Sequence, residues 1–218
     1  MDRTVLSQRI TSILRDIKRI ENTFCALNMV DIQRYPDNFE ALAIDAALRC
    51  EQLVCRARHL IYATANNKTK SEYLNMAADA QGIEIQQHDE IVEIRLPRLL
   101  DKRDKWRSME FLLDPFTAAM EKWARENILP RYERCTVCFT HVYMRGTPIR
   151  MIRDADSMEV KRYLDAVASF LMLDDNGLLC DVHSTAELGD GNYTRITVME
   201  QSRFPGWLNE RVYYSQPD

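Results

Sequence analysis

Hydrophobic residues near the start of the chain recur at alternating steps of four and three, which places them on one side of an α-helix. This stripe predicts a helix over residues 4–29 and consists of Leu6, Ile10, Ile13, Ile17, Ile20, Phe24 and Leu27. A second, alanine-rich apolar pattern predicts a helix from about Asp37 to Ala63, with Asp37 or Asn38 as its N-cap. Two long helices with a short connection are typical of an antiparallel helical hairpin, in which the stripe serves packing or association with another chain.

The pattern changes beyond this hairpin. Residues 63–70 are polar and predict a linker, and Thr69 with Glu72 forms a capping-box pattern for a short helix that ends before Gly82. After Gly82 the hydrophobic period becomes two, which predicts a β-hairpin with strands near residues 83–85 and 91–97.

The remainder of the chain alternates between strand and helix patterns. Asp114 and Pro115 predict the start of a helix that closes before Pro130, with the aspartate as N-cap. Strands are predicted over 134–144 and 149–153, a helix over 157–171, and extended runs over 178–187 and 193–200. The order β-β-α-β-β-α-β-β is typical of an α+β sheet domain. The predicted domains are therefore a helical hairpin (1–68), an α+β domain with two helices in a mixed sheet (69–200) and a C-terminal tail (201–218).

Composition limits the functional classes. The chain has 218 residues, 46% of them hydrophobic, and carries a net charge of −4, which excludes a protein that coats nucleic acid through bulk positive charge. No apolar run approaches the roughly 18–20 residues needed to span a bilayer. No secretory signal is visible, so we expect a cytoplasmic protein without membrane partners. The six cysteines lie among apolar neighbours and are expected to be buried thiols.

The clearest candidate for a functional site in the sequence is a group of four aspartates. Asp154 and Asp156 lie two residues apart at the end of a predicted strand, where both carboxylates point to one side of an extended backbone. Asp174 and Asp175 follow the next predicted helix and join them only if the chain turns back. Carboxylates that gather at neutral pH need a cation, and Mg²⁺ suits such oxygen ligands. Alternatively, Asp156 and Ser157 simply cap the helix and residues 174–177 form an ordinary turn.

Basic residues surround these aspartates in the sequence. Lys161 follows the first acidic pair and is suited to offset charge on a scissile phosphate, while Arg150 and Arg153 are natural phosphate contacts. Residues 98–107 hold five basic and two acidic side chains, which predicts either a solvated loop or a DNA-contacting arm through Arg98, Lys102, Arg103, Lys105, Trp106 and Arg107.

Two other kinds of site are not expected. Cys135 and Cys138 lie in one predicted strand, where positions three apart face opposite sides, so a shared zinc ion would require a distortion. Only six glycines occur in the sequence, and none forms a G-x-G-x-x-G or Walker pattern, so no nucleotide cofactor is expected.

The stretch from Val137 to Met199 resembles the RusA-type Holliday junction resolvases. In that family a strand runs into an Asp-x-Asp-Asn pattern, and a helix bearing a lysine, an Asp-Asp turn and two closing strands follow. The matching residues here are Asp154, Asp156, Lys161, Asp165, Ala166 and Asp175. In element order the resemblance extends over residues 90–200. The whole sequence also resembles an uncharacterised bacterial family carried on integrative and conjugative elements.

The resemblance implies a Mg²⁺-dependent endodeoxyribonuclease that acts on branched DNA as a homodimer. Asp154, Asp156 and Asp175 would bind the metal, with Asp174 as a substitute, and Lys161 would stabilise charge. The alternative is a non-catalytic accessory protein of a mobile element that binds DNA or a host or mobile-element protein, for which the N-terminal helices offer a surface. The acidic balance favours it, as do Ser157 in place of the family's asparagine and a spacing to Lys161 that is one residue longer.

Overall fold

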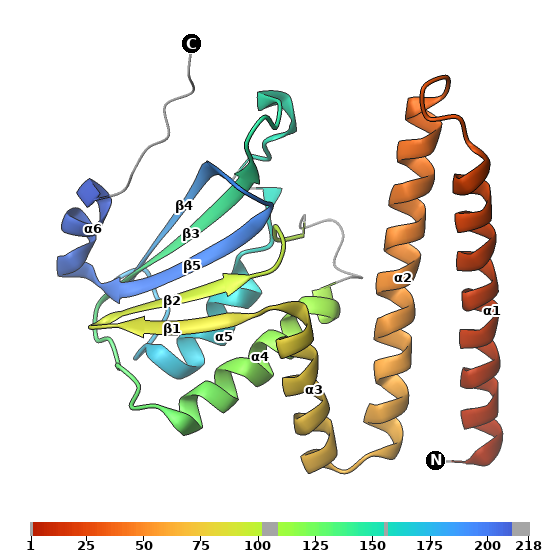
Figure 1. Cartoon of the computed structure of the whole chain (residues 1–218). Coiled ribbons are helices and arrows are strands. Elements are labelled where there is room, and N and C mark those ends of the chain that lie inside the picture. Colours follow the sequence, from red (N-terminus) through yellow and green to blue (C-terminus); the bar gives the residue numbers. More distant parts are fainter. Residues whose placement is uncertain (1, 102–108, 155–156, 211–218) are drawn as a thin grey trace. The chain divides into compact units, whose positions relative to one another are not determined.

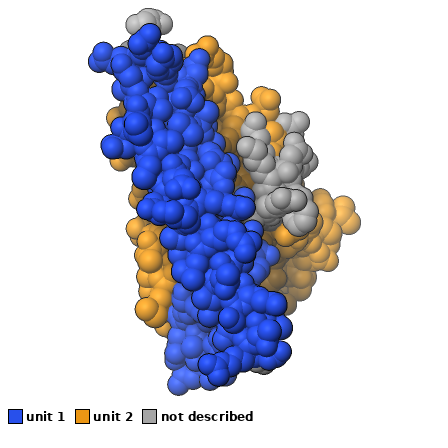
Figure 2. All heavy atoms as spheres, turned by 90° about the vertical axis from the view of Figure 1, so that its right-hand side faces the viewer, with its two compact units in different colours: residues 1–73, 107–112 blue, residues 74–106, 113–218 orange. Residues whose placement is uncertain are grey.

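A computed structural model of the chain describes residues 2–101, 109–154 and 157–210. The chain divides into two compact units, shown in different colours in Figure 2. Unit 1 comprises Met1–Tyr73 with Arg107–Leu112, and unit 2 comprises Leu74–Trp106 with Leu113–Asp218. The fold is α+β, with N-terminal helices followed by a mixed five-stranded sheet and further helices, which confirms the predicted fold class.

Unit 1 is built on the predicted antiparallel hairpin of α1 (Arg3–Met29) and α2 (Pro36–Thr64) (Figure 1). The carboxylate of Asp2 caps α1 by accepting a hydrogen bond from the Thr4 amide at 3.2 Å. The predicted cap of α2 at Asp37 or Asn38 is wrong, because the helix begins with Pro36 at its first position after Tyr35. Proline needs no amide partner there and already has a helical φ, so it starts the helix two residues earlier.

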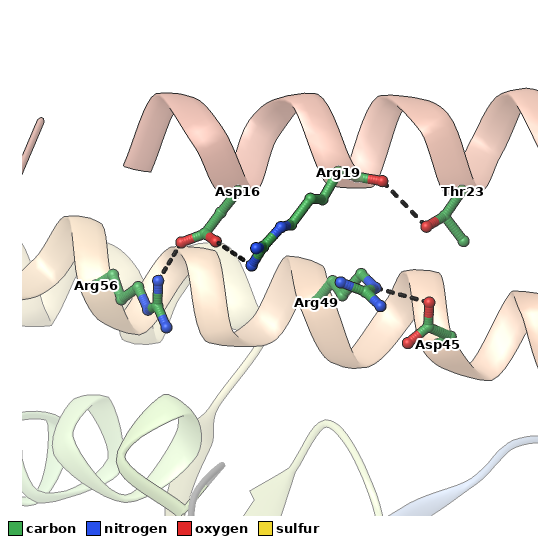
Figure 3. Close-up of polar contacts among 6 residues, drawn as sticks. All are labelled: Asp16, Arg19, Thr23, Asp45, Arg49 and Arg56. Carbon is green, nitrogen blue, oxygen red and sulfur yellow. Dashed lines mark hydrogen bonds and ion pairs between the residues drawn. The ribbon is translucent and has the colours of Figure 1, made fainter. Parts of the chain in front are cut away.

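Charged side chains follow the seam between the two helices (Figure 3). Asp16 on α1 pairs with Arg56 on α2 and lies 3.7 Å from the guanidinium of Arg19. On α2, Arg49 Nε lies 2.6 Å from an oxygen of Asp45, one turn earlier in the same helix. The pair between Asp16 and Arg56 fixes the level at which the two antiparallel helices face each other.

The apolar stripe of α1 divides into two sets. The residues Leu6, Ile13, Ile20 and Leu27, seven apart, are half-buried, whereas Ile10, Ile17 and Phe24 are 42%, 45% and 51% exposed. None of the described residues of α1 is fully buried. One helix neighbour covers only one side of a helix, so the hairpin leaves the second set facing solvent.

The linker predicted over residues 63–70 is wrong. Only Ala65 and Asn66 separate α2 from α3 (Asn67–Gln81). The side-chain oxygen of Asn66 accepts a hydrogen bond from the Thr69 amide at 2.9 Å, so Asn66 caps the new helix in place of Thr69. Gly82 ends α3 with a φ of 75°, a conformation that glycine adopts without steric cost.

Unit 2 contains a sheet with the strand order β1-β2-β5-β3-β4 (Figure 1). The predicted β-hairpin forms β1 (Glu84–His88) and β2 (Ile91–Leu96). The remaining strands are β3 (Cys135–Met144), β4 (Cys180–Gly189) and β5 (Tyr193–Glu200). The pair β3–β4 is parallel and the other pairs are antiparallel, so the sheet is mixed.

The helices α4 (Met109–Glu126) and α5 (Lys161–Leu171) lie on one side of this sheet (Figure 1). Apolar residues of the three inner strands alternate onto the same face, because the register pairs Val137 with Val198 and Phe139 with Ile196. The rings of Phe116 on α4 and Tyr163 on α5 lie 5.6 Å apart, and both residues are fully buried. The core of unit 2 therefore lies between these helices and the sheet.

The helix predicted to start at Asp114–Pro115 in fact begins at Met109, with Pro115 inside it. Proline has no amide hydrogen, so Pro115 cannot donate the usual helical hydrogen bond to the Phe111 carbonyl four residues earlier. The buried guanidinium of Arg58 on α2 supplies one, since its Nη2 donates to Phe111 O at 3.3 Å and its Nη1 donates to Glu110 O. A donor from a distant part of the sequence thus lets the helix run through a proline.

Two further predictions around the candidate aspartates are wrong. Residues 149–151 form a 3₁₀ turn, η2 (Ile149–Met151), instead of a strand, and the apolar Ile149 is 71% exposed. As the second arm of a hairpin after β3, a strand here would pair with β3, whose two edges are occupied by β4 and β5. The helix predicted from Ser157 begins at Lys161, because the Glu159 amide donates to Asp101 O at 2.9 Å instead of starting a helical turn.

The predicted tail contains a short helix, α6 (Phe204–Glu210). Its first residue, Phe204, stacks on His183 of β4 with ring centroids 4.3 Å apart. In the part of the chain that the structure describes, no helix has both the length and the apolarity to cross a membrane.

Candidate functional site

Lys161 links two of the candidate acidic side chains. Its Nζ lies 2.5 Å from Asp165 Oδ1, one turn further along α5, and 2.6 Å from Asp175 Oδ2 in the loop after that helix. We call Lys161, Asp165 and Asp175 the lysine cluster. Asp175 therefore lies within hydrogen-bond distance of the side chain that opens α5, although fourteen residues separate the two in the sequence.

Contacts within the lysine cluster shift the pKa values of Lys161 and Asp175. Hydrogen bonds to Asp165 and then to Asp175 raise the pKa of Lys161 above its ordinary value. The hydrogen bond from Lys161 lowers the pKa of Asp175 below its ordinary value. The Lys161 ammonium group therefore lies between the carboxyl groups of Asp165 and Asp175.

The backbone of Tyr132 makes the chain turn back after α5. The Tyr132 amide donates to Leu171 O at 2.9 Å, and the Leu173 amide donates to Tyr132 O at 3.1 Å, which forms a parallel bridge. Next, Asp174 Oδ1 accepts a hydrogen bond from the Asn176 amide at 3.1 Å. Asp174 thus shapes the loop, while the side chain of its neighbour Asp175 reaches Lys161.

Asp154, the first residue of the first acidic pair, lies in the loop between η2 and α5. Asp154 is exposed, and its main-chain oxygen accepts hydrogen bonds from the amide and the hydroxyl of Ser157 at 3.1 and 2.8 Å. Ser157 therefore closes a turn instead of capping the predicted helix. Asp156 lies outside the described residues.

Two backbone segments that carry candidate phosphate contacts lie side by side. Arg153 Nη1 donates to Leu100 O at 2.7 Å, and its amide donates to the hydroxyl of Tyr143 at 3.0 Å. Arg98 Nη2 lies 2.5 Å from Asp101 Oδ1. Arg150 is exposed in η2. The entry to the predicted basic arm thus adjoins the acidic loop, and the arm's other candidates lie outside the described residues: Lys102, Arg103, Lys105, Trp106 and Arg107.

The donor chemistry partly fits a magnesium ion. Within residues 2–101, 109–154 and 157–210, no group of three or more His, Cys, Asp or Glu side chains that could hold a metal ion occurs. Mg²⁺ needs fewer protein ligands than that, because it is commonly bound by one or two carboxylates together with water and substrate phosphate oxygens. Asp154 and Asp175 are described carboxylates of the right kind, and the lysine ammonium already occupies one oxygen of Asp175.

Three cysteines lie in the sheet together with the buried histidine His141. Cys135 and Cys180 are register partners on β3 and β4, Cys138 projects to the opposite face from Cys135, and all three are free thiols. His141 on β3 is 1% exposed, and its Nδ1 lies 3.4 Å from Thr194 Oγ1. Burial, assisted by the charge of Arg153, lowers the pKa of His141 to about 4. The apolar strand neighbours of His141 are the sequence signal that this side chain is buried.

A separate groove of about 570 Å³ lies on the helical hairpin. Its lining includes Arg56 and His59, and each of these has an acidic neighbour. Arg56 pairs with Asp16, and His59 Nε2 lies 3.1 Å from Glu110 Oε2. Arg56 and His59 therefore contribute little unpaired positive charge to the groove with which to bind an anion.

The family model described as "Family of unknown function (DUF6100)" matches residues 2–216, nearly the whole chain. No curated protein matches the sequence.

Proposed function

The chain belongs to the family DUF6100, and we propose that its unit 2 is a Mg²⁺-dependent endodeoxyribonuclease for branched DNA, like the RusA-type Holliday junction resolvases that the sequence resembles. The observation that carries this proposal is the contact between Lys161 and Asp175 at 2.6 Å. The resemblance matches Lys161 to the family's helix lysine and Asp175 to its later Asp-Asp turn. These two residues would meet only if the chain folded back after α5, and it does.

The proposed roles follow from residue chemistry. Asp154, Asp156 and Asp175 would hold the metal, with Asp174 as a substitute. A bound Mg²⁺ polarises a phosphodiester oxygen and lowers the pKa of the attacking water. Lys161, whose ammonium group lies beside the Asp175 carboxylate, would offset the charge on the scissile phosphate.

The DNA backbone would be held beside the acidic loop. Arg150 is exposed there, and the Arg153 contact to Leu100 joins this loop to the segment that leads into the basic arm. Contacts from Arg98 and the arm to phosphates would make binding depend on salt. A homodimer would place two such sites on the two strands of a junction, in the cytoplasm where bacterial DNA lies.

The second candidate is a non-catalytic accessory protein of a mobile element that binds DNA or a protein. One observation favours it: the ammonium group of Lys161 already balances Asp165 and Asp175 without any metal ion. In this case the lysine cluster is a structural clamp that holds the loop after α5 against the helix.

A cleavage assay separates the two functions. Purified full-length protein is incubated with a labelled four-way junction and with linear duplex, each in Mg²⁺, Mn²⁺ or EDTA. If the protein is a nuclease, junction cleavage should require a divalent cation. The cleavage rate should fall roughly 100-fold or more in Asp154→Asn and Asp175→Asn. Asp190→Asn, at an exposed aspartate in the β4–β5 turn, is the matched control and should cleave normally. Junction binding without cleavage in either metal supports the accessory protein and refutes the nuclease.

A further inference from the structure

Four apolar side chains of α1 face solvent along one stripe. Ile10, Leu14, Ile17 and Phe24 are 42%, 60%, 45% and 51% exposed, and their steps of four, three and seven place them on the same side of the helix. They are distinct from the half-buried set that begins at Leu6. We call these four residues the outer stripe.

Three of the four residues of the outer stripe are spaced symmetrically about Ile17. Ile10 precedes it by seven residues and Phe24 follows it by seven. Seven residues make almost two helical turns, so residues seven apart stay on the same side of α1 and can contact a second, antiparallel copy of α1 along its whole length. A two-fold axis through Ile17 therefore sets Ile17 against its own copy and Ile10 against the partner's Phe24, which is the arrangement of an isologous interface.

The charge within the outer stripe is already balanced. Glu21 lies seven residues after Leu14, on the line between Ile17 and Phe24. Its Oε2 lies 2.7 Å from Lys18 Nζ in the same helix. A second copy can therefore approach without leaving an unpaired carboxylate in the contact.

We propose that the outer stripe is the contact surface for a second copy of this chain, with the two α1 helices antiparallel and crossing at Ile17. The 27 residues of α1 span about 40 Å. A strip of that length and about 10 Å wide covers on the order of 400 Å² on each copy. That is below the roughly 800 Å² per partner of a stable interface, so the dimer is a weak and reversible one.

Disulfide trapping tests the geometry directly. The full chain first receives Cys25→Ser and Cys50→Ser, which remove the thiols that are not buried. Ile17→Cys is then oxidised with copper phenanthroline and should give a covalent dimer by itself. Ile10→Cys and Phe24→Cys should each stay uncrosslinked alone and form a mixed dimer when combined, because like residues would lie about 20 Å apart in the antiparallel pair.

Sedimentation equilibrium over a range of protein concentrations supplies a second readout. Ile17→Glu should raise the dissociation constant of the dimer at least tenfold, whereas Met76→Glu, at a 69% exposed position on α3, should leave it unchanged. Far-UV circular dichroism checks that each variant keeps its helices. Self-crosslinking of Ile10→Cys, an unchanged dissociation constant in Ile17→Glu, or a monomer at all concentrations would each overturn the proposal. A dimer formed through unit 2 would give none of the predicted crosslinks, so the nuclease proposal stands or falls separately.

Discussion

Replacement of Arg58 by methionine is the sharpest test of how α4 tolerates its internal proline. Methionine keeps most of the aliphatic volume and removes the guanidinium group, including the donors Nη1 and Nη2. The carbonyl of Phe111 then loses the donor that stands in for the missing amide of Pro115, and Glu110 O loses its contact with Nη1. Arg58 is 1% exposed, so water does not readily replace these bonds.

The expected magnitude follows from these two bonds. A hydrogen bond from a charged donor contributes about 1.5–3 kcal/mol, so two contribute about 3–6 kcal/mol. Part of this is recovered because the folded chain no longer has to desolvate a guanidinium group. We therefore expect Arg58→Met to lower the free energy of unfolding by about 2–4 kcal/mol.

A double-mutant cycle with Pro115→Ala isolates the cause. Alanine restores an amide that Phe111 O can accept within α4, so Arg58→Met should cost at least about 1 kcal/mol less in that background. Urea unfolding, followed by both fluorescence and circular dichroism, measures the four proteins. Arg49→Met is the control, because Arg49 lies on the same helix in a half-exposed pair and should cost less than about 1 kcal/mol. Effects of Arg58→Met and Pro115→Ala that add within about 0.5 kcal/mol would refute the reasoning.

Three further predictions concern unit 2. Burial lowers the pKa of His141 from 6.5 to about 4, so as the pH falls the unfolded chain takes up a proton before the folded chain does. The free energy of unfolding should therefore decrease as the pH is lowered from 6.5 to 4. Urea titrations should show a weaker pH dependence of this free energy in His141→Gln. A Cβ at Gly189 would lie 2.6 Å from Val142 Cγ1, so Gly189→Ala should cost about 1–3 kcal/mol in chemical denaturation, and Val142→Ala should recover part of that loss. Lys161→Met should raise the pKa of Asp175 toward its ordinary value in a carboxyl NMR titration, and an unchanged pKa would contradict the lysine cluster.

The elements that the sequence predicts well are those whose pattern is set by the core they face. The alternation in residues 91–96 and the apolar run of residues 135–144 give β2 and β3 almost to the residue. The heptad spacing likewise gives α1. The alternation of β2 and the stripe of α1 show the period that one-sided burial imposes, whereas β3 is buried on both faces and shows a continuous run.

The predictions that fail depend on partners far along the chain. The local pattern Asp114–Pro115 is a good helix start, and only Arg58, more than fifty residues earlier, lets α4 begin before it. Residues 149–153 have an apolar strand pattern, yet the edges of β3 are filled by strands that come later in the sequence. Neither the Arg58 contact nor the occupied edges of β3 can be predicted from the neighbouring residues in the sequence.

The candidate site was predicted in part. The residue types at Lys161 and Asp175 indicated their chemistry, but their contact depends on the Tyr132 bridge that turns the chain after α5. A bridge between backbone groups forty residues apart leaves no pattern in side-chain composition. The roles of Asp154, Asp156 and the basic arm stay predictions.

The strand order has a consequence for synthesis on the ribosome. The last strand, β5, inserts between β2 and β3, so neither of these has its inner neighbour until Tyr193–Glu200 has emerged. A nascent chain that stops earlier carries one short β-hairpin and one parallel strand pair with exposed edges, which are prone to aggregate. Helices α1 and α2, whose contacts are local, can form long before that moment. During translation the helical hairpin of α1 and α2 can therefore form first, and the sheet is completed only after β5 has been synthesised.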